Sequence, residues 1–410
     1  MRVKVTALIL AVTPNPSSLR KLLQFLRTYR DWTQYVVNEI WDLNHVPSMK
    51  ELHYRFYKVL RQQGFRAHHC HKIERRAREV VKAVKKNKGS KPILKKLTAR
   101  LDYQDYRLDI KNKILRVAVL NNEWIELKLL WYEYLDKYFK GKWKLKEILA
   151  SYREDTTWIY LTFEKKVELK NPITIMGVDI NFNNITYTII DVNGKLVSMG
   201  VLLFNGLKRA LTHKIIAEKI QRKYSKMWRF VRGIRESIRK HNMRARNILT
   251  DSCHYTSRKI VEMAKEYNAM IVLEDLNELR INANGSRKFN KKLMLWAYRR
   301  IQNYIYYKAL IERLHVIHVN PKGTSKVSPM SGRLVFINYR WIKLPNSVIT
   351  TRDIVASWNL ALRGLKFLTR NVGHRGSMDA PKAPDQMQAH GGMKGKPVPV
   401  NLGILSTRIT

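Results

Sequence analysis

Residues 173–200, ITIMGVDINFNNITYTIIDVNGKLVSMG, constrain the fold more than any other part of the chain. Their apolar side chains alternate or run together as in strands, and the pair Asn193-Gly194 supplies the positive φ angles that a tight hairpin needs. The pattern predicts three consecutive antiparallel strands. The first carries Asp179 among apolar residues, where an ionised carboxylate costs desolvation energy unless a positive group compensates it. Asp179 is therefore the first residue that needs an explanation.

Two later carboxylates occupy comparable positions. A short apolar run, Met270 to Leu273, ends in Glu274, as a buried parallel strand does when an acid lies at its carboxyl end. Asp353 opens a segment whose apolar residues recur at helical spacing. One acid on each of three buried elements is the arrangement of a metal site built from distant parts of a chain. Such a site can hold two Mg²⁺ (or Mn²⁺) ions about 3.5 to 4 Å apart for phosphodiester hydrolysis.

Each acid also has an ordinary structural explanation when it is taken alone. Asp179 would be a surface residue in a turn, and Glu274 would end a strand in water. Asp353 would form a helix-capping box with Thr350, which stabilises a helix start by about 1 kcal/mol. All three explanations must hold together to remove the site, so the joint pattern favours a shared role.

The order of these acids resembles the TnpB family, the RNA-guided DNA nucleases encoded by insertion sequences and related to type V CRISPR effectors. GVDINFNNIT is similar to the family's first RuvC motif, IVLEDL to the second and TTRDIVASWNLAL to the third. The similarity runs from residue 173 to about residue 365 and includes YYKAL and HVNPKGTSKVSPMSG. Three motifs in this order form a specific signal, whereas any one would be weak. The resemblance implies that Asp179, Glu274 and Asp353 are the catalytic, metal-binding acids.

The resemblance also implies a fold and partners. The fold would be α/β, with a ribonuclease H-like (RuvC) nuclease domain over residues 173–368. Residues 1–172 would form a β wedge with a helical recognition lobe inserted at about 17–100. The implied partners are guide RNA and target double-stranded DNA, the sequence being read mainly by base pairing. The alternative is a guide-RNA-dependent DNA-binding protein, a repressor, that does not cut. A third possibility is an unguided, structure-specific nuclease.

The net charge of +46 argues independently for a polyanionic partner. Self-repulsion on this scale needs neutralisation, and nucleic acid is the usual source of it. An acidic membrane surface is the alternative, but no run of about 18 apolar residues is present to span a bilayer. Cys70 and Cys253 exclude a disulfide framework and fit a reducing compartment. We expect a cytoplasmic, nucleoid-associated protein, and the sequence leaves its oligomeric state open.

The N-terminal part combines strands and basic helices. Residues 1–14 predict a strand that ends at Pro14, rather than a signal peptide, and a helix capped by Ser17 or Ser18 follows. Helical pattern continues to about residue 96, after which two strands are expected to meet at Asn121 and Asn122. The adjacent residues His68, His69, Cys70 and His71 point in different directions on a helix, so we expect no metal site there.

Between the first two acids the sequence predicts a long basic helix over residues 207–247 and a separate helix that begins at His254. The basic face is expected to bind nucleic acid. Aromatic residues at helical spacing usually belong to a core. Tyr224, Trp228 and Phe230 are therefore expected to pack inside the protein.

One departure from the family pattern lies at about residues 320–349, where TnpB proteins usually carry a zinc ribbon of two Cys-x-x-Cys pairs. The corresponding residues here are Ser328, Ser331, Leu344 and Ser347, so we expect no zinc. Two explanations fit this loss: the apolar residues between 334 and 344 fold the loop into a hairpin by packing, or the chain is a decaying copy kept only as a nucleic-acid binder. Residues 369–410, rich in Gly, Pro and polar side chains, are expected to form a disordered basic tail.

Overall fold

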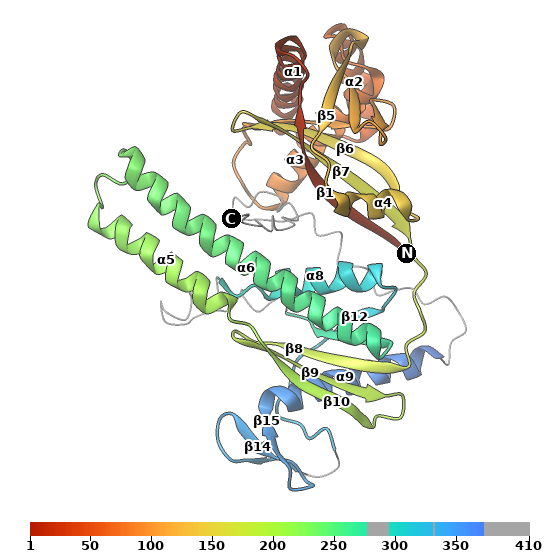
Figure 1. The fold of residues 1–410 in the computed structure, drawn as a ribbon, viewed down its shortest axis with the longest axis vertical. Helices are drawn as coiled ribbons and strands as arrows, with labels where there is room; N and C mark the ends of the chain where they lie inside the picture. Colours follow the sequence, from red (N-terminus) through yellow and green to blue (C-terminus); the bar gives the residue numbers. More distant parts are fainter. Residues whose placement is uncertain (277–294, 331–332, 373–410) are drawn as a thin grey trace, which may run out of the picture. The chain divides into compact units, whose positions relative to one another are not determined.

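The computed structural model describes residues 1–276, 295–330 and 333–372 (Figure 1). The described chain divides into two compact units, residues 2–166 and the residues from Val167 onward. Across the described residues, no helix has the length and apolar character that crossing a membrane requires. Most of the predicted basic tail, from residue 373, lies outside the described residues.

The unit of residues 2–166 is built on an antiparallel sheet with strand order β2-β6-β7-β1-β5-β4-β3. The central strand β1 pairs with β7 along most of its length and with β5 at its end. The predicted strands on either side of Asn121 and Asn122 are present and paired. The bounds are β1 Arg2–Val12, β2 Leu97–Leu101, β3 Tyr106–Asp109, β4 Ile114–Ala118, β5 Trp124–Leu129, β6 Lys144–Arg153 and β7 Thr156–Lys166.

Three helices are inserted between β1 and β2, where the sequence predicts helical structure. They are α1 (Pro16–Trp41), α2 (Met49–Gln62) and α3 (Ala67–Lys86). The predicted cap of the first helix was wrong, because the Asn15 side chain accepts the hydrogen bond from the Ser18 amide. Pro16 follows at the first helical position, where a missing N–H costs nothing.

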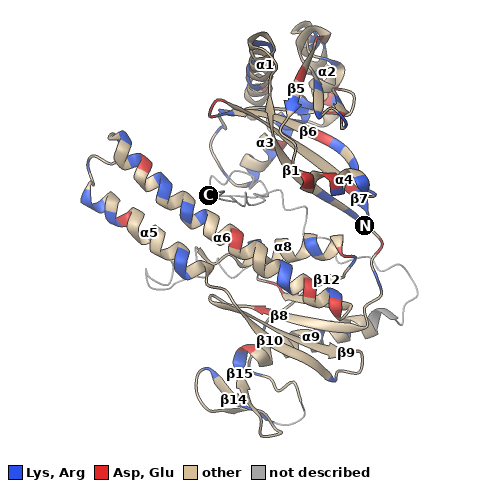
Figure 2. Ribbon diagram, in the orientation of Figure 1, with Lys and Arg blue, Asp and Glu red and all other residues tan. Residues whose placement is uncertain are grey.

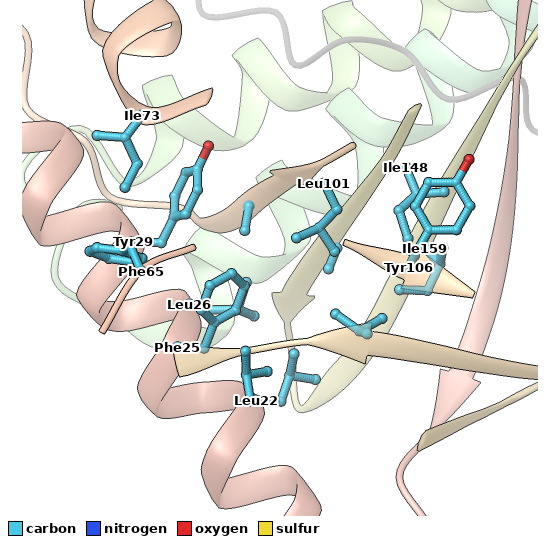
Figure 3. Close-up of a cluster of buried hydrophobic side chains, with 14 of the residues drawn as sticks. Leu22, Phe25, Leu26, Tyr29, Phe65, Ile73, Leu101, Tyr106, Ile148 and Ile159 are labelled. Carbon is cyan, nitrogen blue, oxygen red and sulfur yellow. The ribbon is translucent and has the colours of Figure 1, made fainter. Parts of the chain in front are cut away.

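The core of this unit lies between these helices and the sheet (Figure 3). Leu22, Phe25 and Leu26 recur at helical spacing along α1 and are fully buried. They meet side chains from the strands, such as Leu101 and Ile148, which are also fully buried. The ring of Phe25 in α1 packs edge to face with that of Phe65, in the loop between α2 and α3, and their centroids are 6.4 Å apart. Apolar burial therefore joins the helical insertion to the sheet.

The second unit contains a five-stranded sheet of order β10-β9-β8-β11-β12. The three predicted antiparallel strands are confirmed, and β11 and β12 run parallel to β8. In the turn before β10 only Gly194 has a positive φ, +85°, so the prediction of two such residues at Asn193-Gly194 was wrong. The bounds are β8 Thr174–Ile180, β9 Asn184–Asp191, β10 Leu196–Leu203, β11 Ala269–Glu274 and β12 Val316–Val319.

Helices cover both faces of this sheet, which explains why β8 is buried along its whole length. Met176, Val178 and Ile180 of β8 belong to the core formed with α5 (Gly206–Lys223), α6 (Arg232–Glu266) and α8 (Tyr298–Ile311). Ile175 belongs instead to the core formed with α9 (Arg352–Val372). Because side chains alternate along a strand, Gly177 and Asp179 share the α9 face with Ile175.

The helices between β10 and β11 break at a different place from the one predicted. α6 runs unbroken through His254, and the break lies between α5 and α6 instead. Thr250 and Ser257 lie inside α6. Their hydroxyls donate to the carbonyls of Arg246 and Cys253, one turn earlier in the helix, which is how such side chains are accommodated within helices. The prediction that the aromatic residues pack was wrong for Phe230, which lies in this break and is 83% exposed.

The loop expected to pack without a metal forms a small antiparallel sheet of β13 (Val335–Phe336), β14 (Trp341–Lys343) and β15 (Ile349–Thr351). The hairpin is confirmed, but its expected packing was largely wrong. Only Ile342 and Leu344 of this loop are fully buried among the described residues, whereas Phe336 and Trp341 are exposed. Strands this short bury one face at most, so alternate side chains point to solvent.

Helix α9 lies directly against the backbone of β8 at Gly177. A Cβ atom at this position would lie 2.0 Å from the Ser357 carbonyl oxygen and 2.5 Å from the Ala361 nitrogen, both in the α9 backbone. Farther along α9, a Cβ at Gly364 would lie 2.4 Å from the Val272 side chain of β11. The two glycines let the helix approach closer than any residue with a side chain would allow.

We therefore expect Gly177→Ala to destabilise the protein by about 1–3 kcal/mol or more, because the colliding atoms are backbone and cannot turn aside. Chemical denaturation followed by circular dichroism measures this. Gly233→Ala is the control, since nothing lies within 4 Å of a Cβ at Gly233 in α6, and alanine there should be neutral or stabilising. Equal stability of Gly177→Ala and the parent protein would contradict the tight approach.

Candidate active site

Strand register brings the first two predicted acids together. β8 and β11 are parallel, with Ile271 opposite Met176 and Leu273 opposite Val178. The next residues in this register are Asp179 and Glu274, both at the carboxyl ends of their strands. Met270, Val272 and Glu274 are alternate residues of β11, so their side chains lie on one face of the sheet. Met270 and Val272 belong to the core that α9 helps to form. Both acids therefore point to the face of the sheet that α9 covers.

The third acid reaches the same place from α9. Asp353 is the second residue of the helix, and the Asn184 side chain of β9 donates to its Oδ2 over 3.3 Å. The alternative explanation of Asp353, a capping box with Thr350, was wrong, since Thr351 Oγ1 accepts from the Ile354 amide instead. A buried hydroxyl pair, Thr188 and Ser357, joins β9 to α9 over 2.7 Å one turn later. All three predicted acids thus come to one site.

Neighbouring polar groups orient the acids. Asn181 Nδ2 donates to Asp179 Oδ2 over 2.8 Å, and the Trp296 indole donates to the Asn181 carbonyl over 3.2 Å. Gln302 of α8 donates to the backbone carbonyl of Glu274 over 2.7 Å. The strand ends that carry the acids are therefore held by side chains from outside the sheet. The sequence reasoning missed Asn184 and Gln302, because neither lies in a recognisable pattern with an acid.

The site is electrostatically unfavourable when the acids are ionised. Asp179 is 7% exposed, and burial raises its pKa well above the usual value. The negative charges of Glu274 and Asp353 raise this pKa further, while the hydrogen bond from Asn181 lowers it. Burial also raises the pKa of Glu274 to about 7, against the opposing charge of Arg363. Three carboxylates that repel one another are the setting in which a bound cation relieves the cost.

The donor set fits a hard divalent cation. All the charged donors are carboxylate oxygens, and none of the three acids forms an ion pair with Lys or Arg in the described part of the chain. Magnesium and manganese prefer such oxygen ligands. Among the described residues, these three acids do not form a group whose candidate ligand atoms all lie within 4.8 Å of one another. At least two of their ligand atoms are therefore farther apart than 4.8 Å.

The loop before α9 is tied to the helix by polar side chains. Asn359 Nδ2 donates to the carbonyls of Thr324 and Val327 over 2.8 and 2.7 Å. Arg363 donates to the carbonyls of Asn320 and Lys322. These bonds fix the start of the segment in which the sequence predicts no zinc.

The residues of that segment lie in unlike surroundings. Ser328 Oγ accepts from the Met330 amide, Leu344 is buried in the α9 core, and Ser347 has a φ of 65° in a turn. Ser331 lies outside the described residues. The absence of zinc from this segment stays a prediction.

Comparisons with known proteins match parts of the chain that contribute to the candidate site. The family model described as Cas12f1-like, TNB domain matches residues 298–360, which include α8, the small sheet and Asp353. A TnpB-like protein of Methanocaldococcus jannaschii is 30% identical over 253 residues, covering 60% of this chain and 89% of that protein. The chain belongs to the TnpB family. The resemblance drawn from the three motifs is thereby confirmed.

A further curated protein is similar to this TnpB family member in sequence, and two solved structures share its fold. The CRISPR-associated endodeoxyribonuclease Cas12f2 of a Micrarchaeota archaeon is 26% identical over 257 residues, 59% of this chain and 46% of that protein. The cryo-EM structure of a Cas12f1-sgRNA-target DNA complex has a TM-score of 0.63 at 15% identity, covering 84% of this chain and 82% of that one. A mini-RNA-guided endonuclease, CRISPR-Cas_phi3, gives 0.50 at 10% identity, covering 88% and 92%. The likeness to these solved structures confirms the expected α/β fold.

The raised pKa values predict how Asp179 affects stability. An acid whose pKa is higher in the folded than in the unfolded state destabilises the fold once pH exceeds the unfolded value, and the penalty grows until the folded pKa is passed. Asp179→Asn should therefore raise the melting temperature of the metal-free protein at pH 8, and less so at pH 5. Thermal unfolding in a chelator measures this.

Asp251→Asn, at an exposed acid of α6, is the matched control and should show no such trend. A melting temperature for Asp179→Asn that falls at pH 8, or rises more at pH 5, would show that the acid is not under electrostatic strain.

Proposed function

We propose that this protein is an RNA-guided, Mg²⁺-dependent DNA endonuclease of a transposable element. The observation that carries the proposal is the meeting of Asp179, Glu274 and Asp353 on one face of one sheet, in a member of the TnpB family. The sheet, in which β9 runs antiparallel to its neighbours β8 and β10 while β8, β11 and β12 run parallel to one another, would be a ribonuclease H-like (RuvC) core. The similarity to an endodeoxyribonuclease supports the reaction class.

Magnesium would be held by the three carboxylates. When bound, it supplies a nucleophile from water and charge stabilisation for a departing phosphodiester oxygen. The chain's own residues prepare the site for it. Burial keeps the pKa values of Asp179 and Glu274 high, and the charges of Glu274 and Asp353 raise that of Asp179 further, so these acids would release protons when cations bind. Asn181 and Asn184 orient two of the carboxylates by donating to one oxygen of each.

A basic helical hairpin in the same unit offers a phosphate-binding surface. α5 and α6 pack side by side, and Lys and Arg recur along both (Figure 2). The Lys214 ammonium donates to Asn242 Oδ1, and the Nδ1 atoms of His213 and His241 lie 3.1 Å apart. These contacts hold α5 and α6 together. Residues 206–247 contain only two acids, Glu218 and Glu236. In a chain of net charge +46, such a surface suits the backbone of guide RNA or target DNA.

The turn between these helices adds one exposed and two half-buried aromatic side chains to the basic surface. Arg229 lies over the Trp228 ring at 5.0 Å, and Lys223 lies over the Tyr224 ring at 5.4 Å. Phe230 is largely exposed beside them. Accessible rings among cations are the combination that holds unpaired bases by stacking, and the exposed Phe230 ring suits such contact with an opened duplex.

The N-terminal unit would serve as the β wedge and helical recognition lobe. Its antiparallel sheet and three-helix insertion match the order of elements that the resemblance implies. The cryo-EM neighbour that shares the fold holds both an sgRNA and target DNA. Guide RNA and target double-stranded DNA are accordingly the proposed partners here, with sequence read mainly by base pairing.

The test is cleavage of a guide-matched DNA duplex in Mg²⁺ by protein copurified with its RNA. We expect the parent protein to cut, Asp179→Ala to lose cleavage to background, and Asp251→Asn to cut normally. Duplex lacking the guide match should stay intact. Guide-dependent binding without cutting by the parent protein would favour the alternative function, a DNA-binding repressor. Cutting by RNA-free protein would favour an unguided nuclease.

The orienting role of Asn184 gives a finer prediction. Asn184→Ala should lower the cleavage rate by about 10–100-fold, the usual effect of losing a group that orients a metal ligand. Guide-dependent DNA binding, measured by filter binding, should be unchanged because the side chain bonds Asp353. Asn183→Ala, at the exposed neighbour, is the control. Equal rates for both variants would remove Asn184 from the site.

A further inference from the structure

Three metal-ligating side chains meet in the N-terminal unit, in the other unit from the candidate active site. His53 of α2 and His71 of α3 both face Glu74 of α3, with each imidazole Nδ1 3.7 Å from Glu74 Oε2. Candidate ligand atoms of the three residues all lie within 4.8 Å of one another. Among the described residues, this is the one group of three or more His, Cys, Asp or Glu side chains that meets this condition.

Helix geometry explains the meeting. His71 and Glu74 are three residues apart on α3 and so lie on one face of that helix. α2 packs against α3, using the buried face of Leu52, Phe56 and Leu60. His53 follows Leu52 at the edge of this face and therefore points along the seam between the two helices.

Apart from these two imidazoles, which carry a charge only when protonated, Glu74 has no charged partner among the described residues. It is 0% exposed, and neither carboxylate oxygen accepts a hydrogen bond. Although the chain has 78 Lys and Arg, none within the described residues forms an ion pair with Glu74. The buried Nδ1 of His53 likewise lacks a hydrogen-bond partner. Buried polar atoms are nearly always satisfied, so these unpaired atoms, aimed at one point, call for a missing partner.

We infer that His53, His71 and Glu74 bind a divalent first-row transition metal, such as Zn²⁺, that joins α2 to α3. Two imidazoles and one carboxylate are a frequent ligand set for these metals, whereas Mg²⁺ prefers oxygen donors alone. Ligand atoms around a tetrahedral zinc ion lie about 3.4 Å apart, so the 3.7 Å separations need only a small contraction.

The surroundings allow an ion to enter. The His53 and His71 side chains are 40% and 51% exposed, so one side of the site opens to solvent and water can complete the coordination. The two rings are stacked, with centroids 4.6 Å apart and planes 8° apart. Because an imidazole lone pair lies in the ring plane, one ring must turn for both nitrogens to reach one ion. Its exposed edge leaves room for that rotation.

This site could not be recognised from the run His68 to His71. His69 is buried with its Nε2 3.5 Å from Asp105 Oδ1, and His68 lies 3.7 Å from Asp102. These neighbours point apart, as expected for consecutive residues of a helix. His71 instead finds its partner on α2, 18 positions earlier in the chain. The site revises the expectation of a protein without zinc, which was drawn from the loop before α9.

The experiment is titration of the chelator-treated, full-length protein with Zn²⁺, in excess Mg²⁺ to occupy the three-acid site. We expect one tight equivalent, measured by competition with a chromophoric chelator, and a Zn²⁺-dependent rise in melting temperature. Glu74→Gln and His53→Asn should each weaken this binding by more than about 100-fold, since even outer contacts of metal ligands contribute 10–100-fold. Circular dichroism establishes that both variants fold.

Two histidine variants serve as matched controls. His68→Asn changes the neighbouring imidazole on α3, and His241→Asn removes the separate imidazole pair on α5 and α6, so both should keep the tight equivalent. The same affinity in His53→Asn as in the parent protein would overturn the inference, as would no binding at all. Loss of the tight equivalent in His241→Asn alone would assign the ion to the other pair. The result does not depend on DNA cleavage.

Discussion

The approach of α9 to β8 is the contact on which the candidate active site depends. Gly177 has no Cβ, and the space that a Cβ would fill is taken by the backbone of α9 near Ser357 and Ala361. The helix is thereby pressed onto the strand that carries Asp179, and its first turn brings Asp353 to the ends of β8 and β11. A side chain at Gly177 would push the third acid away from the other two. The absence of a side chain at Gly177 therefore allows the distance between α9 and β8 that brings the three acids together.

The acids gathered by this contact work against the stability of the fold. Burial and mutual repulsion raise the pKa of Asp179 well above its usual value, and burial raises that of Glu274 to about 7. In a chain of net charge +46, they nevertheless have no Lys or Arg ion-pair partner among the described residues, and the charge of Arg363 only lowers the pKa of Glu274. A structural role would favour such partners, because unpaired buried charge is costly. Their absence leaves the carboxylates free for a cation, at the expense of stability.

The position of α9 is also held from its outer side. Asn359 and Arg363 donate to carbonyls of the preceding loop, and Ile342 and Leu344 of the small sheet are buried in the same core. The loop thus packs on the helix through Ile342, Leu344, the half-buried Leu334 and several hydrogen bonds, while other apolar residues such as Tyr339 face solvent. The segment matched by the Cas12f1-like family model therefore includes both Asp353 and part of its support.

The sequence by itself determined the three acids, the antiparallel strands that begin at β8 and the membership of the TnpB family, because strand periodicity and short motifs are local properties. It predicted neither the closeness of α9 nor the partners of the acids. Gly177 looks like any glycine in a strand until α9 packs against it, and Asn184 is one of several asparagines. His53 and His71 share no motif, since their meeting depends on how two helices pack. Register, helix approach and burial join residues far apart in the chain, so only the tertiary structure decided them.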